Sequence, residues 1–170
     1  YGRKSAGGAM ARISPARYSA DSTVPRSKLA RTIAGINRIC ARHDLRVGYI
    51  FHAGDGNLHP SIFFDPDDAD MVQRMYQAVR EVMELCVQES GSITGEHGVG
   101  LEKREFMPLM HSPVELAAMR EVKEIFDPHG LLNPDKIFPP ELPSASERRH
   151  PEPDFGELSR ANEAAFTVGG

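Results

Sequence analysis

The sequence predicts an α+β fold, with an antiparallel sheet, helices packed on one side of it and a C-terminal helical segment. Three observations predict this class. The expected elements follow the order strand, helix, strand, strand, helix; two segments show helical apolar spacing; and an Asp-Gly pair separates two β-prone runs. Together they are typical of a half-domain of the ferredoxin-like cap type, in which helices cover a small sheet.

The first helix is expected to begin near Pro25, since proline is favoured at the first helical position. Leu29, Ile33, Ile36 and Cys40 then recur at helical spacing, and the helix should end near residues 43–44. Residues 45–51 alternate and are β-prone, which predicts a strand.

A second strand is expected over residues 58–64, followed by a turn at residues 65–68 that leads into a long helix. One face of that helix, which should run to about Glu89, is apolar and rich in methionine. Because such a stripe is far more often core than a cofactor site, we expect it to be buried. It consists of Met71, Met75, Val79, Val82, Met83 and Cys86.

A glycine-rich connection over residues 91–100 is followed by expected helical segments near 101–110 and 113–125. The sequence Asp127-Pro-His-Gly130 should stop the last helix. Five prolines then lie among charged residues with little apolar pattern. We therefore expect a folded region over residues 1–138 and a Pro-rich tail or linker, largely disordered, over residues 139–170.

Composition indicates a globular protein rather than a membrane or nucleic-acid-binding one. The formal net charge is −4, and no apolar run reaches the roughly 20 residues that span a bilayer. Residues 1–31 are locally basic, with Asp21 their only acid. This cluster is either a solvated face or a positive field for an anionic substrate or flavin phosphates. Cys40 and Cys86 are expected as buried free thiols, consistent with a reducing cytoplasm.

The strongest local motif is His-Ala-Gly-Asp-Gly-Asn-Leu-His at residues 52–59. If Asp55 and Gly56 form a two-residue hairpin loop, residue 52 pairs with residue 59. His52 and His59 then lie opposite one another on one face, with β-carbons about 5 Å apart, close enough to share a metal ion. The pair predicts two ligands of a metal site.

Two imidazoles leave a divalent ion under-coordinated, so a third ligand is expected. Glu96 is the best candidate because the glycines around it let the backbone approach a ligand. Two His and one carboxylate form an open site that suits zinc, manganese or ferrous iron. The adjacent His97 is a candidate general base, since an imidazole near neutrality suits that task.

Three separated motifs, taken together, resemble one flavoprotein family. They are residues 52–59, residues 91–100 and the ending Phe126-Asp-Pro-His-Gly-Leu-Leu-Asn-Pro-Asp-Lys136. The chain is similar to the vanillyl-alcohol-oxidase type of FAD-linked oxidases, and within it to the D subunit of glycolate oxidase and to D-lactate and D-2-hydroxyglutarate dehydrogenases. The resemblance covers roughly residues 1–138 and leaves the tail unmatched.

The resemblance implies the C-terminal, catalytic half of a FAD-dependent dehydrogenase that oxidises a small 2-hydroxyacid, with most flavin contacts in an N-terminal domain outside this chain. It implies that His52, His59 and Glu96 bind zinc or a similar ion and that His97 is the catalytic base. It further implies that Arg3 binds the substrate carboxylate and that Asn133 approaches the flavin. The fragment by itself is expected to be inactive.

Two departures from the family pattern bear on the substrate. D-2-hydroxyglutarate dehydrogenases carry Asn where this chain has Ser61 and Lys near the position of Ser19. Both differences argue against a second substrate carboxylate and favour glycolate or D-lactate.

The resemblance also suggests partners: electron-accepting subunits of a second flavin type and an iron–sulfur type, in the cytoplasm or held through them at the inner membrane face. Two other hypotheses stay open. One is a free-standing 2-His-1-carboxylate metalloenzyme, either an oxygenase or a hydrolase. The other is a non-catalytic interaction subunit that keeps a metal only for structure.

Overall fold

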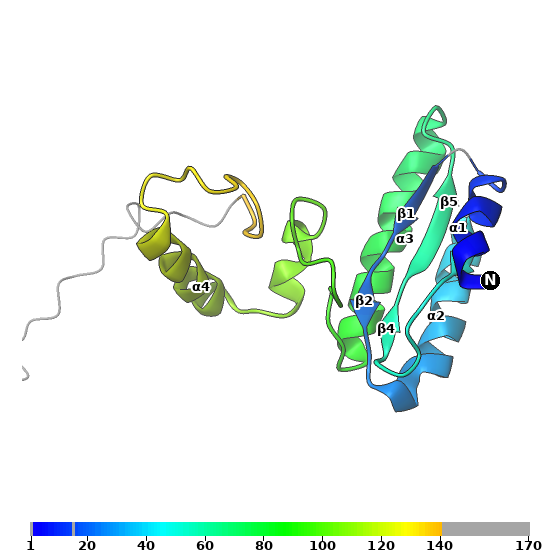
Figure 1. Cartoon of the computed structure of the whole chain (residues 1–170), viewed down its shortest axis with the longest axis horizontal. Helices are drawn as coiled ribbons and strands as arrows, with labels where there is room; N and C mark the ends of the chain where they lie inside the picture. Colours follow the sequence, from blue (N-terminus) through cyan, green and yellow to red (C-terminus); the bar gives the residue numbers. More distant parts are fainter. Residues whose placement is uncertain (1, 15, 141–170) are drawn as a thin grey trace, which may run out of the picture.

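The central element is a three-stranded antiparallel sheet in the order β1-β5-β3, and Figure 1 shows β1 and β5 side by side. The computed structural model describes residues 2–14 and 16–140, and the side chains of residues 2–4 lie outside that description. The strands are β1 (Ala16–Ser19), β3 (Arg46–Tyr49) and β5 (Pro60–Phe64). A short pair, β2 (Ser22–Thr23) and β4 (Asn57–Leu58), continues the β1–β5 register, with Ser19 opposite Ser61 and Ser22 opposite Leu58.

Two long helices cover one face of this sheet, which confirms the predicted α+β class. They are α2 (Leu29–Arg42), preceded by the 3₁₀ turn η1 (Arg26–Lys28), and α3 (Ala69–Gln88). The predicted apolar stripe of α3 forms the core, where Met75, Val79 and Met83 are buried against Leu58 and Ile62 of the sheet. Cys40 and Cys86 are buried free thiols, as expected.

Helix α1 (Gly2–Ala11) was not predicted from the sequence. Three of its residues are glycine, and each glycine makes a helix less stable by about 1 kcal/mol than alanine would. No clear apolar stripe along the helix compensates for this cost. Its Met10 is buried at the sheet face opposite α2 and α3, where a β-carbon built on Gly48 would meet Met10 Cε at 3.1 Å and Phe63 Cζ at 3.2 Å. Tertiary packing therefore holds this helix.

The predicted two-residue loop at Asp55-Gly56 is wrong. His52 forms a bridge with Asn57, not with His59, so the loop contains the four residues 53–56. Gly56 has a left-handed φ of 73°, and a β-carbon there would lie 2.1 Å from the Val24 carbonyl oxygen. The loop therefore packs against the segment around Val24. Its length follows from this tertiary contact rather than from the preference of Asp-Gly for two-residue turns.

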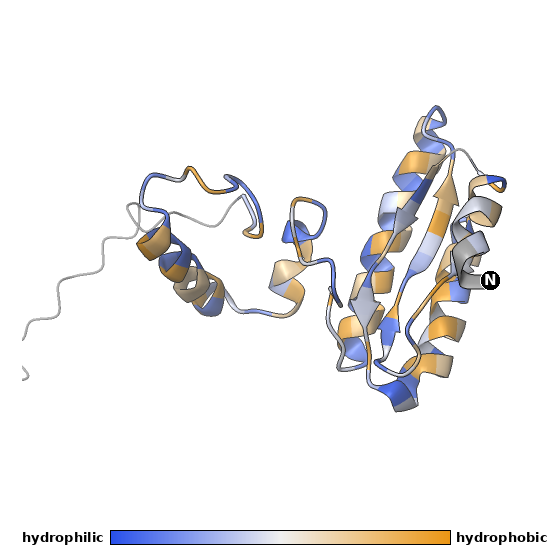
Figure 2. Ribbon diagram, viewed as in Figure 1, coloured by the Kyte–Doolittle hydropathy of each residue, from blue (hydrophilic) through white to orange (hydrophobic). Residues whose placement is uncertain are grey.

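The C-terminal region extends from the sheet through η2 (Arg104–Leu109) to α4 (Pro113–Phe126), as Figure 1 shows. Ser112 and Glu115 form a capping box at the start of α4. Figure 2 shows apolar residues along this region, and several are largely exposed: Val114, Val122, Ile125, Phe126, Leu131 and Leu132. Of the expected tail, residues 141–170 lie outside the described residues. No helix in the described part of the chain is long and apolar enough to cross a membrane.

The core position of Ile62 leads to the first prediction. Its side chain is completely buried between the sheet and the helices, so Ile62→Ala should lower the free energy of unfolding by about 2–5 kcal/mol. Chemical denaturation of the full chain measures this loss. Ile125→Ala makes the same change at a side chain that is 74% exposed and should shift stability by less than about 0.5 kcal/mol. Equal losses in the two variants would contradict the core assignment.

Candidate functional site

The hairpin between β3 and β5 brings His52 and His59 together although they are not opposite partners. His52 pairs with Asn57 of β4, and His59 is two residues further along this extended segment, between β4 and β5. Because side chains alternate with a period of two, this shift leaves both imidazoles on one face as diagonal neighbours. Their ring centroids are 5.6 Å apart and the planes are inclined by 70°.

Glu96 reaches this pair from the glycine-rich connection that follows α3. Its Oε1 lies 3.1 Å from His59 Nε2 and 3.7 Å from His52 Nε2. One potential ligand atom from each of the three residues lies within 4.8 Å of the others, which is a separation that a single ion can bridge. The side chain of Glu96 is 51% exposed, so the cluster is open on one side.

The donor atoms of the cluster fit a divalent cation. His59 Nε2 is buried and has no hydrogen-bond partner among the described residues, because the 3.1 Å approach to Glu96 lacks hydrogen-bond geometry. Burial lowers the pKa of His59, while the charges of Asp21 and Glu96 oppose that shift. Imidazole nitrogens beside a carboxylate oxygen are a set of donor atoms that suits a divalent transition metal.

His97 lies beside the cluster rather than within the triad. Its Nε2 is 3.7 Å from Glu96 Oε1, and its ring centroid is 5.1 Å from that of His59. The imidazole is 54% exposed, so a small molecule bound at the open side can reach it. Position and exposure both suit a group that exchanges a proton with a bound substrate.

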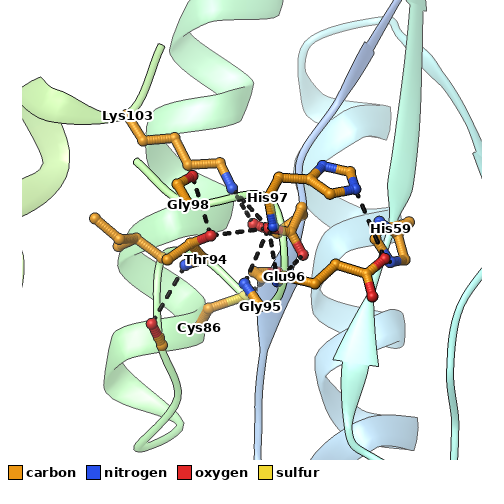
Figure 3. A network of polar contacts seen from close by, with 12 residues as sticks. His59, Cys86, Thr94, Gly95, Glu96, His97, Gly98 and Lys103 are labelled. Carbon is orange, nitrogen blue, oxygen red and sulfur yellow. Dashed lines mark hydrogen bonds and ion pairs between the residues drawn. The ribbon is translucent and has the colours of Figure 1, made fainter. Parts of the chain in front are cut away.

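Asp21 holds the loop that carries Glu96 and His97, and sequence reasoning missed it. Figure 3 shows the loop residues Thr94 to His97 close to Lys103 and His59. The completely buried carboxylate accepts hydrogen bonds from the backbone N–H groups of Gly95 at 2.9 Å, Glu96 at 3.3 Å and His97 at 3.1 Å. The Thr94 hydroxyl also donates to it at 2.9 Å. The only signal in the sequence was that Asp21 is the single acid among the basic residues near the N-terminus.

A buried lysine balances the charge of Asp21. Lys103 Nζ donates to the carboxylate at 3.1 Å and also to the Asp21 carbonyl oxygen. Burial by itself raises the pKa of Asp21, but the backbone donors Gly95 and His97, and then Lys103, outweigh it and hold the pKa well below its usual range. Asp21 is therefore ionised at neutral pH and forms a buried ion pair with Lys103.

The other two predicted site residues are not brought into the cluster by a described contact. Arg3 belongs to α1, which lies on the sheet face that carries His59, but the Arg3 side chain is outside the described part of the structure. Asn133 is exposed in the C-terminal segment, where it adopts a left-handed φ of 47°. That segment returns toward the glycine-rich connection, since the Ile137 N–H donates to the Gly100 carbonyl oxygen at 2.8 Å.

Gly95 leads to the second prediction. A β-carbon built on it would lie 2.5 Å from Asn57 Oδ1 and 2.6 Å from Asp21 Oδ1. Gly95→Ala should therefore displace the loop and weaken zinc binding at the cluster by about 10–100-fold, the range for changes beside a metal site. Competition with a chromophoric chelator measures the affinity. Gly54→Ala is the matched control, because its β-carbon would meet nothing within 4 Å, and unchanged affinity in both variants would contradict the prediction.

Comparison with known proteins identifies the family to which this arrangement belongs. Residues 1–137 match the family model described as FAD linked oxidases, C-terminal domain. The chain belongs to this family. The match covers the sheet, the hairpin, the glycine-rich connection and the C-terminal segment. This match confirms the resemblance to FAD-linked oxidases that the three sequence motifs indicated.

The curated relatives include proteins named for 2-hydroxyacids. Glycolate oxidase subunit GlcD of Escherichia coli K12 is 46% identical over 138 residues, which are 81% of this chain and 28% of that protein. GlcD of Bacillus subtilis is 41% identical over 80% of this chain and 29% of its own length. D-2-hydroxyglutarate dehydrogenase of Stutzerimonas stutzeri is 36% identical over 71% of this chain and 27% of its own length. The chain spans less than a third of each relative.

Proposed function

We propose that this chain forms the metal-binding and substrate-binding half of a FAD-dependent 2-hydroxyacid dehydrogenase that converts glycolate or D-lactate to the 2-oxoacid. The convergence of His52, His59 and Glu96 beside an exposed His97, in a chain of the FAD-linked oxidase family, carries the proposal. His52, His59 and Glu96 are proposed to hold one divalent ion, with zinc favoured over manganese or iron. When bound, such an ion acts as a Lewis acid toward the substrate hydroxyl.

His97 is proposed to accept the hydroxyl proton of the substrate. Its imidazole is exposed at the open side of the cluster, with Nε2 3.7 Å from Glu96 Oε1, where a bound substrate can reach it. The reaction removes two electrons and two protons from the CH–OH group, and the FAD supplies the hydride acceptor. Arg3, on α1 at the same sheet face, is proposed to pair with the substrate carboxylate in a bidentate manner.

The substrate preference is proposed to depend on Ser19 and Ser61, which are direct cross-strand partners. Because residue 61 is two positions after residue 59 along the extended chain that leads into β5, both serines lie on the sheet face that carries His59. Neither hydroxyl offers the positive charge that a second substrate carboxylate needs. The pair therefore supports a small monocarboxylate such as glycolate or D-lactate.

The flavin is proposed to be bound mostly by a separate domain that contacts the C-terminal segment. Phe126 and Leu131 are 78% and 77% exposed, an unusual state for large apolar side chains that suits an interface. Asn133, beside them in sequence, is proposed to approach the flavin. Electron-accepting flavin-type and iron–sulfur subunits remain part of the proposal, as does a cytoplasmic location, free or at the inner membrane face through these subunits.

The competing functions are less well supported. A purely structural metal site is normally closed by four protein ligands, whereas this cluster has an exposed carboxylate and an open side. A free-standing oxygenase or hydrolase would need no flavin, yet the family match covers the whole described core. Metal-dependent turnover by this chain alone would restore that alternative.

A chimera tests the proposal. The 138 aligned residues of Escherichia coli GlcD are replaced by those of this chain, and the flavin spectrum verifies assembly. Glycolate or D-lactate, added without oxygen, should bleach the oxidised-flavin band, and a chelator should prevent it. A flavin-loaded chimera that neither substrate bleaches, while GlcD itself responds, would contradict the proposed function.

A further inference from the structure

The buried carboxylate of Asp21 holds the backbone from which the Glu96 and His97 side chains project. Both side chains are about half exposed, so packing does little to hold them, and their positions follow from the backbone to which they are attached. That backbone donates three consecutive N–H groups, from Gly95 to His97, to Asp21. Fixed backbone donors around a fully buried charge form a rigid anchor, because hydrogen bonds to a charged group are stronger than those between neutral groups.

The same residue links this loop to the strand that carries His59. The register that pairs Ser19 with Ser61 and Ser22 with Leu58 places residue 21 opposite residue 59. Asp21, between β1 and β2, therefore lies directly beside His59, between β4 and β5, while its carboxylate holds the loop. The cluster of His52, His59 and Glu96 is assembled from two segments that are far apart in sequence, and Asp21 holds one of them and lies beside the other.

We propose that Asp21 is the positioning residue of this site: it sets Glu96 against His59 for metal binding and directs His97 toward the substrate. The inference deepens the proposed function and rests on it. Lys103, which is buried on the Asp21 carboxylate, keeps the anchor charged without adding a net buried charge. Thr94 contributes a further donor from the start of the loop.

The alternative role for Asp21 is that of a metal ligand, since Asp21, His59 and His97 also have potential ligand atoms within 4.8 Å of one another. The hydrogen bonds argue against it. Oδ2 already accepts from Thr94, Gly95, His97 and Lys103, and Oδ1 accepts from the Glu96 N–H at 3.3 Å, so the loop engages both oxygens of the carboxylate. Glu96 makes no such set of bonds and extends into the open side of the cluster.

Zinc titration of the full chain tests the proposal, with affinity measured by chelator competition and cobalt(II) absorbance as a probe of ligand geometry. Asp21→Asn keeps the side-chain volume but presents an NH₂ group to N–H donors, so it should weaken zinc binding by about 10–100-fold and alter the cobalt spectrum. Ile62→Ala is the matched control: it loses stability in the core without touching the loop, and its zinc affinity should equal that of the wild type.

Each result separates one claim from another. Zinc affinity unchanged in Asp21→Asn would overturn the positioning role, whereas a wild-type chain that binds no zinc would overturn the proposed metal site itself. If Glu96→Gln keeps zinc and Asp21→Asn loses it, Asp21 is a ligand and the positioning role is wrong. Should Asp21→Asn fail to fold, Thr94→Val decides: a loss of about tenfold supports the anchor, and no loss overturns it.

Discussion

Replacing His59 by alanine should abolish stoichiometric zinc binding, with a loss of affinity of at least about a hundredfold, the upper range for changes outside the ligand shell. The imidazole is 12% exposed and its Nε2 has no hydrogen-bond partner among the described residues, so a bound ion would supply the partner that this nitrogen lacks. Isothermal titration of the full chain with zinc measures the loss.

The stability of the same variant gives an independent check. A hundredfold excess of zinc over its Kd should stabilise the wild-type chain by about 2.7 kcal/mol, and this gain should vanish in His59→Ala. His43→Ala is the matched control, because His43 pairs with Glu81 at 2.7 Å between α2 and α3 and has no part in the cluster. Zinc stabilisation of His59→Ala equal to that of His43→Ala would rule out the ligand assignment.

The second large effect is expected from His97→Ala. In the GlcD chimera, loss of the proposed base should lower the rate of flavin bleaching by about 10²–10⁴-fold, the usual contribution of general acid–base catalysis. Zinc content should stay at the wild-type level, since His97 is outside the proposed triad of His52, His59 and Glu96. Anaerobic stopped-flow absorbance and metal analysis of the same sample measure both quantities.

The opposite pattern would change the assignment. If His97→Ala loses zinc together with activity, His97 is a ligand, as the second cluster with Asp21 and His59 would require. If bleaching proceeds at the wild-type rate, another group accepts the proton. His43→Ala again serves as the control and should alter neither rate nor zinc content.

Much of the fold could be predicted from local patterns. In α2 and α3, apolar side chains recur with the period of a helix. This periodicity is enough to predict which face of each helix is buried. Helix α1 could not be predicted, because its three glycines disfavour a helix and its position depends on tertiary packing, such as that of Met10 against the sheet. The hairpin was expected, but its loop is two residues longer than the Asp-Gly pattern indicated, because Gly56 packs against the Val24 carbonyl.

For the candidate site, the sequence by itself determined that His52 and His59 share a face. Side-chain direction alternates along a strand, so a shift of two residues in register leaves the face unchanged. Only the tertiary structure decided which face Glu96 would meet and what would hold it there. Asp21 and Lys103 are 82 positions apart in sequence, and their pairing depends on burial from water, which no local pattern encodes.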